Sequence, residues 1–153
     1  MKISKLVLNN FSSYENINIF DFTNDNQHPI ILIGGQNGAG KTSLFTAIKV
    51  ALYGPLAFGY TGNNSFYTKK IKELINSKVF QSEDFIAGVS IEISIKQDRE
   101  IKTYNIVRNW SIKDKKLIED YYIEQNHSKL NDTEKNYFES FLMTIIPPDL
   151  FDF

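Results

Sequence analysis

A glycine-rich stretch at residues 35–42 constrains the fold of this chain more than any other feature. It fits the pattern G-x-x-x-x-G-K-[ST] at every fixed position. Its residues are Gly35, Gln36, Asn37, Gly38, Ala39, Gly40, Lys41 and Thr42. Glycine lets the backbone adopt positive φ and approach a ligand without a Cβ clash. Successive N–H groups can then form a cradle for an anion, so the pattern predicts a phosphate-binding loop, or P-loop.

The residue types in this loop predict a nucleoside triphosphate with Mg²⁺ as the ligand. In such loops the lysine reaches the β- and γ-phosphates, and the threonine hydroxyl ligates Mg²⁺. Lys41 is therefore the expected catalytic residue and Thr42 the expected metal ligand, and Ser43 is counted with the nucleotide contacts. Either ATP or GTP fits the loop. We expect ATP because no guanine-reading segment is visible.

The residues that flank the loop supply the context that a P-loop requires, which is a buried strand before it and a helix after it. Residues 30–33, IILI, form an apolar run typical of a strand buried on both faces of a parallel sheet. Residues 41–53 carry apolar side chains at helical spacing, with Gly54 as the expected C-cap and Pro55 preventing continuation. A glycine-rich turn with a chance lysine would lack this context. We expect a parallel core sheet.

Most of the remaining chain alternates between apolar and polar residues, as half-buried strands do. Two strands are expected before the P-loop, at 3–8 and 17–22. Three alternating runs follow it, at 90–96, 103–112 and 117–124, and the short polar segments QDRE and KDKK separate them. This spacing predicts an antiparallel meander with one solvated face. Helices are expected at 68–78 and 132–145, the second with Asp132 or Thr133 as N-cap.

Composition narrows the function classes. A chain of 153 residues with 42% hydrophobic residues is long enough for one domain with a core. The net charge is −1, which argues against strong DNA binding by this chain alone. The absence of cysteine excludes disulfides, thiolate zinc sites and a cysteine nucleophile. No signal peptide or membrane-spanning run is visible, so we expect a cytoplasmic protein.

Other candidate sites are weaker, and each has a plainer interpretation. His28 and His127 lack nearby ligands and are expected on the surface. Asp149 and Asp152 lack the apolar strand that precedes a Walker B aspartate. Clusters of lysine and the aromatic residues of the meander could contact nucleic acid, but a solvated face and a buried core are the expected roles. The residues concerned are Lys69, Lys70, Lys72, Lys113, Lys115, Lys116 and Trp110.

The order of elements resembles the first lobe of an ABC-type ATPase head, as in the SMC, SbcC and RecF group of DNA-processing proteins. Residues 2–22 resemble the two opening strands of that group, including an Asn-Phe pair at Asn10 and Phe11. Residues 34–54, GGQNGAGKTSLFTAIKVALYG, resemble its P-loop and helix. The resemblance implies an α/β fold of the P-loop NTPase type over residues 1–153. It also implies nucleotide contacts from the segment Asn10, Phe11, Ser12 and Ser13.

A narrower resemblance is to the DndD family, the ATPases of bacterial DNA phosphorothioation. It is carried by residues 51–67, ALYGPLAFGYTGNNSFY, and by IIPPDL at 145–150. This resemblance implies ATP hydrolysis, DndC and DndE as partners, and contact with DNA through the assembled complex. It also implies a C-terminal lobe of the same protein and a second head. A repair ATPase of the SbcC or RecF kind and a non-hydrolysing ATP-sensing module remain alternatives.

The sequence departs from the group in two respects. Many members have a basic residue directly after the Asn-Phe pair, where it can reach the phosphates, and this chain has Ser12. No signature motif, Walker B strand or catalytic glutamate follows the meander. We therefore expect the N-terminal lobe or a split half of a longer head, which holds ATP but hydrolyses little of it alone.

Overall fold

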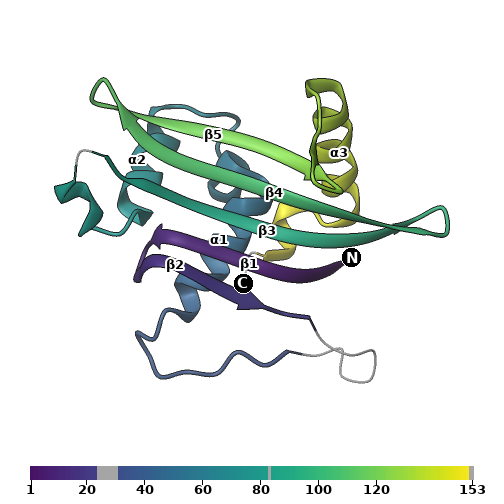
Figure 1. Cartoon of the computed structure of the whole chain (residues 1–153), viewed down its shortest axis with the longest axis horizontal. Helices are drawn as coiled ribbons and strands as arrows, with labels where there is room; N and C mark the ends of the chain where they lie inside the picture. The colour runs from purple at the N-terminus through teal and green to yellow at the C-terminus, as the bar shows by residue number, and fades with distance from the viewer. Residues whose placement is uncertain (24–30, 83, 152–153) are drawn as a thin grey trace.

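The structure is a computed structural model that describes residues 1–23, 31–82 and 84–151. Its centre is a six-stranded sheet in the order β2-β1-β3-β4-β5-β6 (Figure 1). Every neighbouring pair of strands is antiparallel. The strands are β1 (Lys2–Phe11), β2 (Tyr14–Asp21), β3 (Ile86–Gln97), β4 (Glu100–Lys113), β5 (Lys116–Gln125) and β6 (Ser128–Lys129). The helices are α1 (Lys41–Tyr53), α2 (Ser65–Leu74) and α3 (Asp132–Ile145), with short 3₁₀ segments η1 (Gly54–Phe58), η2 (Val79–Gln81) and η3 (Pro148–Phe151).

The predicted meander is confirmed, and its turns show why the polar separators work. The turn between β3 and β4 has Asp98 and Arg99 at φ 46° and 72°. The turn between β4 and β5 has Asp114 and Lys115 at φ 50° and 62°. Positive φ at both central residues matches the right-handed twist of the flanking strands, so two-residue turns of this kind close tight hairpins.

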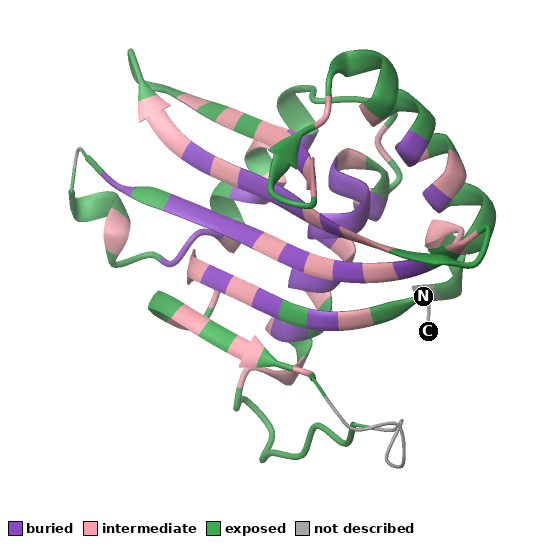
Figure 2. Ribbon diagram, turned by 45° about the vertical axis from the view of Figure 1, so that its right-hand side comes forward, coloured by how far each residue is buried: buried purple, intermediate pink, exposed green. Residues whose placement is uncertain are grey.

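All three α-helices pack on one face of the sheet, and the core lies between them (Figure 2). On β4 the side chains at positions 104, 106, 108 and 110 face the helices and are buried. Tyr104 packs on Phe138 of α3, with ring centroids 4.2 Å apart. Helix α1 contributes seven buried residues to the core. Its bounds agree with the prediction, and the N–H of Gly54 bonds the carbonyl of Val50 at its C-terminal end.

The other two helices have asparagine N-caps that the prediction did not include. Helix α2 begins three residues earlier than predicted, since the Asn64 side chain accepts hydrogen bonds from the N–H groups of Phe66 and Tyr67, both at 3.0 Å. Helix α3 has the predicted bounds, but its N-cap is Asn131. Asn131 and Glu134 form a reciprocal capping box with both hydrogen bonds at 2.9 Å.

The predicted buried strand before the P-loop is wrong for the residues that the structure describes. Ile31, Leu32 and Ile33 form no strand and are 44%, 91% and 50% exposed. Residue 30 lies outside the described part. The sheet over 1–23, 31–82 and 84–151 is antiparallel, and no parallel core sheet is present there. A strand buried on both faces needs ladder partners and packing layers, and no described strand lies beside residues 31–33.

No helix among the described residues is long and apolar enough to cross a membrane.

Candidate functional site

The P-loop lies at the N-terminal end of α1. Gly38 and Gly40 both have positive φ, 84° and 88°, which turns the chain into the helix. The N–H of Ala39 donates to the carbonyl of Gln36 at 3.1 Å and closes the turn. Gly40 is the N-cap of α1, and no side chain caps this end. The N–H groups of the first helical turn have no partner inside the helix, so they form a natural anion site.

Gly40 is required by a close approach as well as by its φ. A Cβ at this position would lie 2.7 Å from the Tyr14 hydroxyl and 3.0 Å from Ser13 Oγ. A Cβ at Gly38 would meet nothing within 4 Å. Gly40, the second fixed glycine of the sequence pattern, is therefore the residue at which Ser13 and Tyr14 contact the loop.

The side chain of Lys41 folds back over the loop. Its Nζ donates to the carbonyl oxygens of Gly35 and Gln36, the latter at 2.7 Å. The ammonium therefore lies at the rim of the loop, where a phosphate oxygen could replace a carbonyl as its partner. Thr42 follows in the first turn of α1 and is exposed, so its hydroxyl is available to ligate a cation.

A cavity of about 360 Å³ opens at this point of the surface. Its lining consists of hydroxyl groups, one ammonium group, one carboxamide and glycine backbone, which suits a phosphorylated ligand with a bound cation. The lining residues are Ser13, Asn37, Gly38, Gly40, Lys41, Thr42 and Ser43.

The structure divides the predicted segment Asn10–Ser13 into two parts. Ser13 lines the cavity, and Ser12 Oγ lies 2.7 Å from Ser43 Oγ on α1. Asn10 instead holds the turn: its Nδ2 donates to the carbonyl of Ile86 at 3.0 Å, and its Oδ1 accepts from the N–H of Asn16. Phe11 is fully buried in the core. The structure thus brings Ser12 and Ser13 to the loop and directs Asn10 and Phe11 away from it.

Sequence reasoning missed Tyr14, the first residue of β2. Its hydroxyl donates to the carbonyl of Gly40 at 3.2 Å. The available signal was its position directly after two serines that were expected at the nucleotide.

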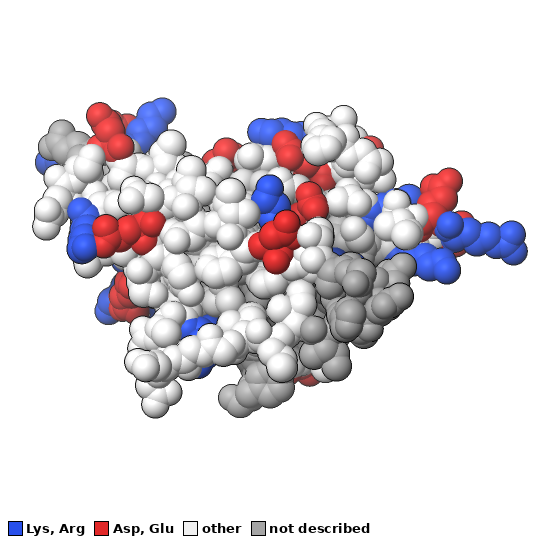
Figure 3. All heavy atoms as spheres, turned by 60° about the horizontal axis from the view of Figure 1, so that its bottom comes forward, with Lys and Arg blue, Asp and Glu red and all other residues white. Residues whose placement is uncertain are grey.

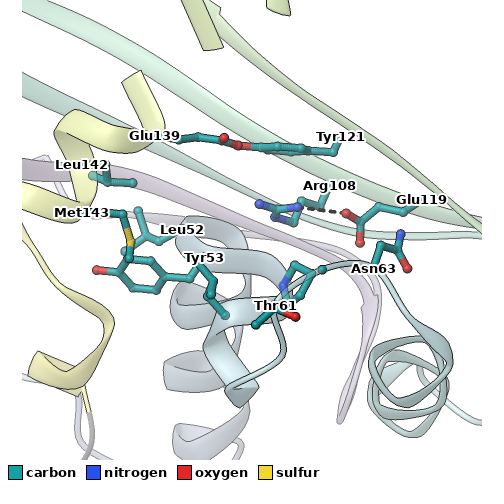
Figure 4. Close-up of a pocket in the computed structure, with 13 residues that line it drawn as sticks. Leu52, Tyr53, Thr61, Asn63, Arg108, Glu119, Tyr121, Glu139, Leu142 and Met143 are labelled. Atoms are coloured by element: carbon teal, nitrogen blue, oxygen red, sulfur yellow. Dashed lines mark hydrogen bonds and ion pairs between the residues drawn. The ribbon is translucent and has the colours of Figure 1, made fainter. Parts of the chain in front are cut away.

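A second cavity, of about 330 Å³, lies between α1, α3 and the sheet (Figure 4). Glu119 on β5 is at its polar end, where its carboxylate accepts hydrogen bonds from Tyr67 Oη at 2.5 Å and Trp110 Nε1 at 2.8 Å. Arg108 Nη1 donates to the same carboxylate at 2.9 Å. Burial raises the pKa of the Tyr67 phenol, and the neighbouring Glu119 carboxylate raises it further.

Arg108 is held on its other sides as well. Its Nε donates to the carbonyl of Ala51 at 3.3 Å, near the C-terminal end of α1. Its Cζ lies 3.6 Å from the centroid of the Tyr121 ring, and Tyr121 Oη donates to Glu139 of α3 at 2.6 Å. The side chains of Arg108, Glu119 and Tyr121 thus have partners within the protein, and they anchor the helices to the sheet.

The weaker sequence candidates gain nothing from the structure. His28 and Asp152 lie outside the described residues. Within the described part, no three His, Cys, Asp or Glu side chains are grouped as metal ligands. Trp110 is 1% exposed, which confirms its expected burial and leaves no face for a base to stack on. Lys70 is paired with Glu73 at 3.5 Å.

The chain is similar to known proteins over most of its length. A family model described as an AAA domain matches residues 5–146. The chain is 33% identical over 102 residues to the SbcC subunit of nuclease SbcCD from Vibrio cholerae serotype O1, a match that spans 66% of this chain and 10% of the relative. It is 43% identical over 54 residues to the SbcC subunit of the same nuclease from Staphylococcus haemolyticus, across 35% of this chain and 5% of that protein. The chain thus covers a tenth or less of the length of these relatives. With a family match over nearly its whole length and a P-loop in place, the chain belongs to the AAA domain family.

Proposed function

We propose that residues 1–153 form the nucleotide-binding first lobe of an SMC/SbcC-like ATPase head, with ATP and Mg²⁺ as ligands. One observation carries the proposal: Gly38 and Gly40 at positive φ set a polar cavity against the uncapped N-terminus of a 13-residue helix. The AAA domain match and the two SbcC relatives support the same class.

Each P-loop residue has a role in this proposal. Lys41 would exchange the carbonyls of Gly35 and Gln36 for β- and γ-phosphate oxygens. The first-turn amides of α1 would hold the phosphates, and the Thr42 hydroxyl would ligate the cation. When bound, Mg²⁺ neutralises charge on the phosphates. Ser13 and Ser43 would contact the same ligand from the cavity wall.

Among residues 1–23, 31–82 and 84–151, the groups that line the site lie around the P-loop and would contact the nucleotide from one side. Hydrolysis also needs a positioned water, a group that orients it, and charge stabilisation opposite the loop. We place these groups in a C-terminal lobe and a second head, as the family resemblance implies. The exposed apolar residues 31–33 support this placement, because strands of a second lobe could cover them. The chain alone should therefore bind ATP and turn over little of it. Adding the C-terminal lobe should restore phosphate release that depends on Lys41.

Two DNA-processing assignments fit this lobe. The SbcC relatives favour a DNA-repair ATPase that acts with a nuclease partner. The DndD assignment, with DndC and DndE as partners in DNA phosphorothioation, depends on residues 51–67. In the structure this segment ends α1, forms η1 and begins α2, and it brings together four aromatic rings with neighbouring centroids 6.2–6.4 Å apart. The rings belong to Phe58, Tyr60, Phe66 and Tyr67. A non-hydrolysing ATP sensor is the third candidate.

Thermal unfolding with and without ATP·Mg²⁺ tests the nucleotide proposal. At a ligand concentration 100-fold above Kd, binding should stabilise the folded chain by about 2.7 kcal/mol. Lys41→Ala should remove most of this stabilisation, whereas Lys69→Ala on α2 should retain it. No shift for the wild-type chain would refute the nucleotide proposal.

Deleting the gene in its host separates the two DNA assignments. Loss of phosphorothioate linkages from genomic DNA, detected by mass spectrometry, would support the DndD assignment. Unchanged sulfur content with increased sensitivity to double-strand breaks would support the repair assignment.

A further inference from the structure

Two hydrogen bonds connect the β1–β2 region to the P-loop and the start of α1. The Oγ atoms of Ser12 and Ser43 are hydrogen-bonded at 2.7 Å, and Tyr14 Oη donates to the carbonyl of Gly40 at 3.2 Å. The same Gly40 carbonyl accepts the first hydrogen bond of α1, from the N–H of Leu44 at 2.9 Å. Tyr14 therefore bonds to the peptide at which the P-loop becomes a helix.

The sheet, rather than the loop, sets the position of the Tyr14 ring. Tyr14 is the first residue of β2 and pairs with Phe11 of β1. Its ring packs edge-on against Phe20 of the same strand, with centroids 5.5 Å apart and an interplanar angle of 87°. A side chain fixed in this way presents its hydroxyl at a defined point against Gly40.

We infer that Tyr14 is a positioning residue for the P-loop, which acts through the Gly40 carbonyl. The inference rests on the proposed function, because it concerns the same ATP site. Gly40 has φ 88°. Because glycine has no side chain, its backbone is conformationally free, and contacts from other residues must fix the orientation of its peptide plane. The hydrogen bond from Tyr14 orients this peptide and so aligns the amides of the loop and first helical turn toward the cavity.

Tyr14→Phe in the full chain tests this role, because it removes one oxygen and leaves the ring packed on Phe20. We expect the Kd for ATP·Mg²⁺ to rise about 2- to 5-fold, the factor expected for one long neutral hydrogen bond. Amide hydrogen exchange should become faster at residues 36–43 and stay unchanged in β3, β4 and β5. Tm without nucleotide should stay within about 2 °C of wild type. Tyr137→Phe on α3 is the matched control, since this 74% exposed tyrosine also loses only a hydroxyl.

Each other outcome overturns the inference in a recognisable way. If wild type binds ATP and Tyr14→Phe binds it equally well with unchanged exchange at 36–43, the hydroxyl positions nothing. If Tyr14→Phe accelerates exchange throughout the sheet, Tyr14 has a general structural role. If neither the wild-type chain nor Tyr137→Phe binds ATP, the proposed function fails first and the inference with it.

Discussion

Arg108 and Glu119 form an ion pair inside the protein, with Nη1 and Oε1 2.9 Å apart and side chains only 5% and 7% exposed. The two residues come from neighbouring strands, β4 and β5, and the guanidinium also bonds the carbonyl of Ala51 on α1. The pair therefore fixes the C-terminal end of the P-loop helix to the sheet. A cation near the last carbonyls of a helix also interacts favourably with the helix dipole.

Glu119→Gln should destabilise the fold strongly. The substitution keeps the shape of the side chain but leaves the Arg108 charge buried without a counter-ion, and breaking a buried pair in this way costs about 3–5 kcal/mol. Urea unfolding followed by circular dichroism gives the change in free energy. Glu124→Gln on the same strand is the control, because that side chain is half-buried and has only a 3.4 Å contact from Asn105. Equal effects of the two substitutions would show that the buried pair is not an anchor.

Gly54→Ala should also be severe, because a steric clash adds to backbone strain at this position. Gly54 has φ 54°, and a Cβ there would lie 2.6 Å from Arg108 Cζ. Gly59 has φ 75° but open space around its Cβ position. Gly59, with ψ 16°, lies in the left-handed helical region, whereas Gly54, with ψ −122°, lies outside it. Gly59→Ala should therefore cost about 1 kcal/mol from strain alone, and Gly54→Ala at least about 2 kcal/mol more from greater strain together with overpacking. Denaturant midpoints of both variants measure the difference, and similar midpoints would contradict the close approach of Arg108 to Gly54.

Stability should fall at alkaline pH because of three tyrosines on the helix-covered side of the sheet. Burial raises the pKa of Tyr53 to about 12, with a further contribution from Asp149. Burial also raises the pKa values of Tyr67 and Tyr121. An unfolded tyrosine titrates near pH 10, so the unfolded chain loses these protons at lower pH than the folded chain. The contribution is fully present below about pH 10 and is lost as pH rises toward about 12.

Unfolding free energy measured from about pH 8 upward, together with tyrosinate absorbance, checks this pH dependence. Tyr67→Phe should flatten the decline above about pH 10, since it removes one of the linked protons. A slope that is the same in wild type and Tyr67→Phe would show that Tyr67 does not contribute.

Local features of the fold could be predicted from the sequence where a local rule decides the outcome. The bounds of α1 follow from apolar spacing and Gly54, and the hairpins follow from alternation with polar turn pairs. The start of α2 differs from its prediction because the cap residue, Asn64, lies in a segment with the composition of a loop. The order of strands is a different kind of information. Pairing of β1 with β3, as in Leu6 opposite Ile91, joins segments far apart in the sequence, and no local pattern specifies it.

In the candidate site, too, some residues can be predicted from local sequence and others depend on long-range contacts. The P-loop residues can be identified from their spacing, whereas Tyr14 cannot, because its role depends on how the β1–β2 turn meets Gly40. Arg108 gives a usable signal: it occupies the same strand face as the apolar residues Ile106 and Trp110. A charged residue in an apolar register indicates a buried partner, but the identity of that partner, Glu119, requires the pairing of β4 with β5.

The chain should bind duplex DNA weakly, with a shallow dependence on salt. Its net charge is −1, and on the face shown in Figure 3 acidic and basic side chains are interspersed rather than gathered into one basic patch. Affinity that depends on neutralised phosphates falls steeply with salt only when many cations contact the backbone. Fluorescence anisotropy at several salt concentrations measures both quantities. Tight binding at physiological salt with a steep slope would contradict the expectation and direct attention to the lysines of α2 and of the β4–β5 turn.

Leu32 is 91% exposed although its sequence context resembles a buried strand. In the chain alone, Leu32→Asn should change the unfolding free energy by no more than about 0.5 kcal/mol. The same change at Leu6, a fully buried residue of β1, should cost several kcal/mol, since it removes core packing and buries an amide. If strands of a second lobe cover residues 31–33 in the complete head, Leu32→Asn should also prevent that lobe from restoring ATP hydrolysis. Urea unfolding of both variants and phosphate release with the added lobe supply the two measurements. A large loss of stability for Leu32→Asn in the chain alone would mean that residues 31–33 are buried within this lobe, as their apolar sequence predicts.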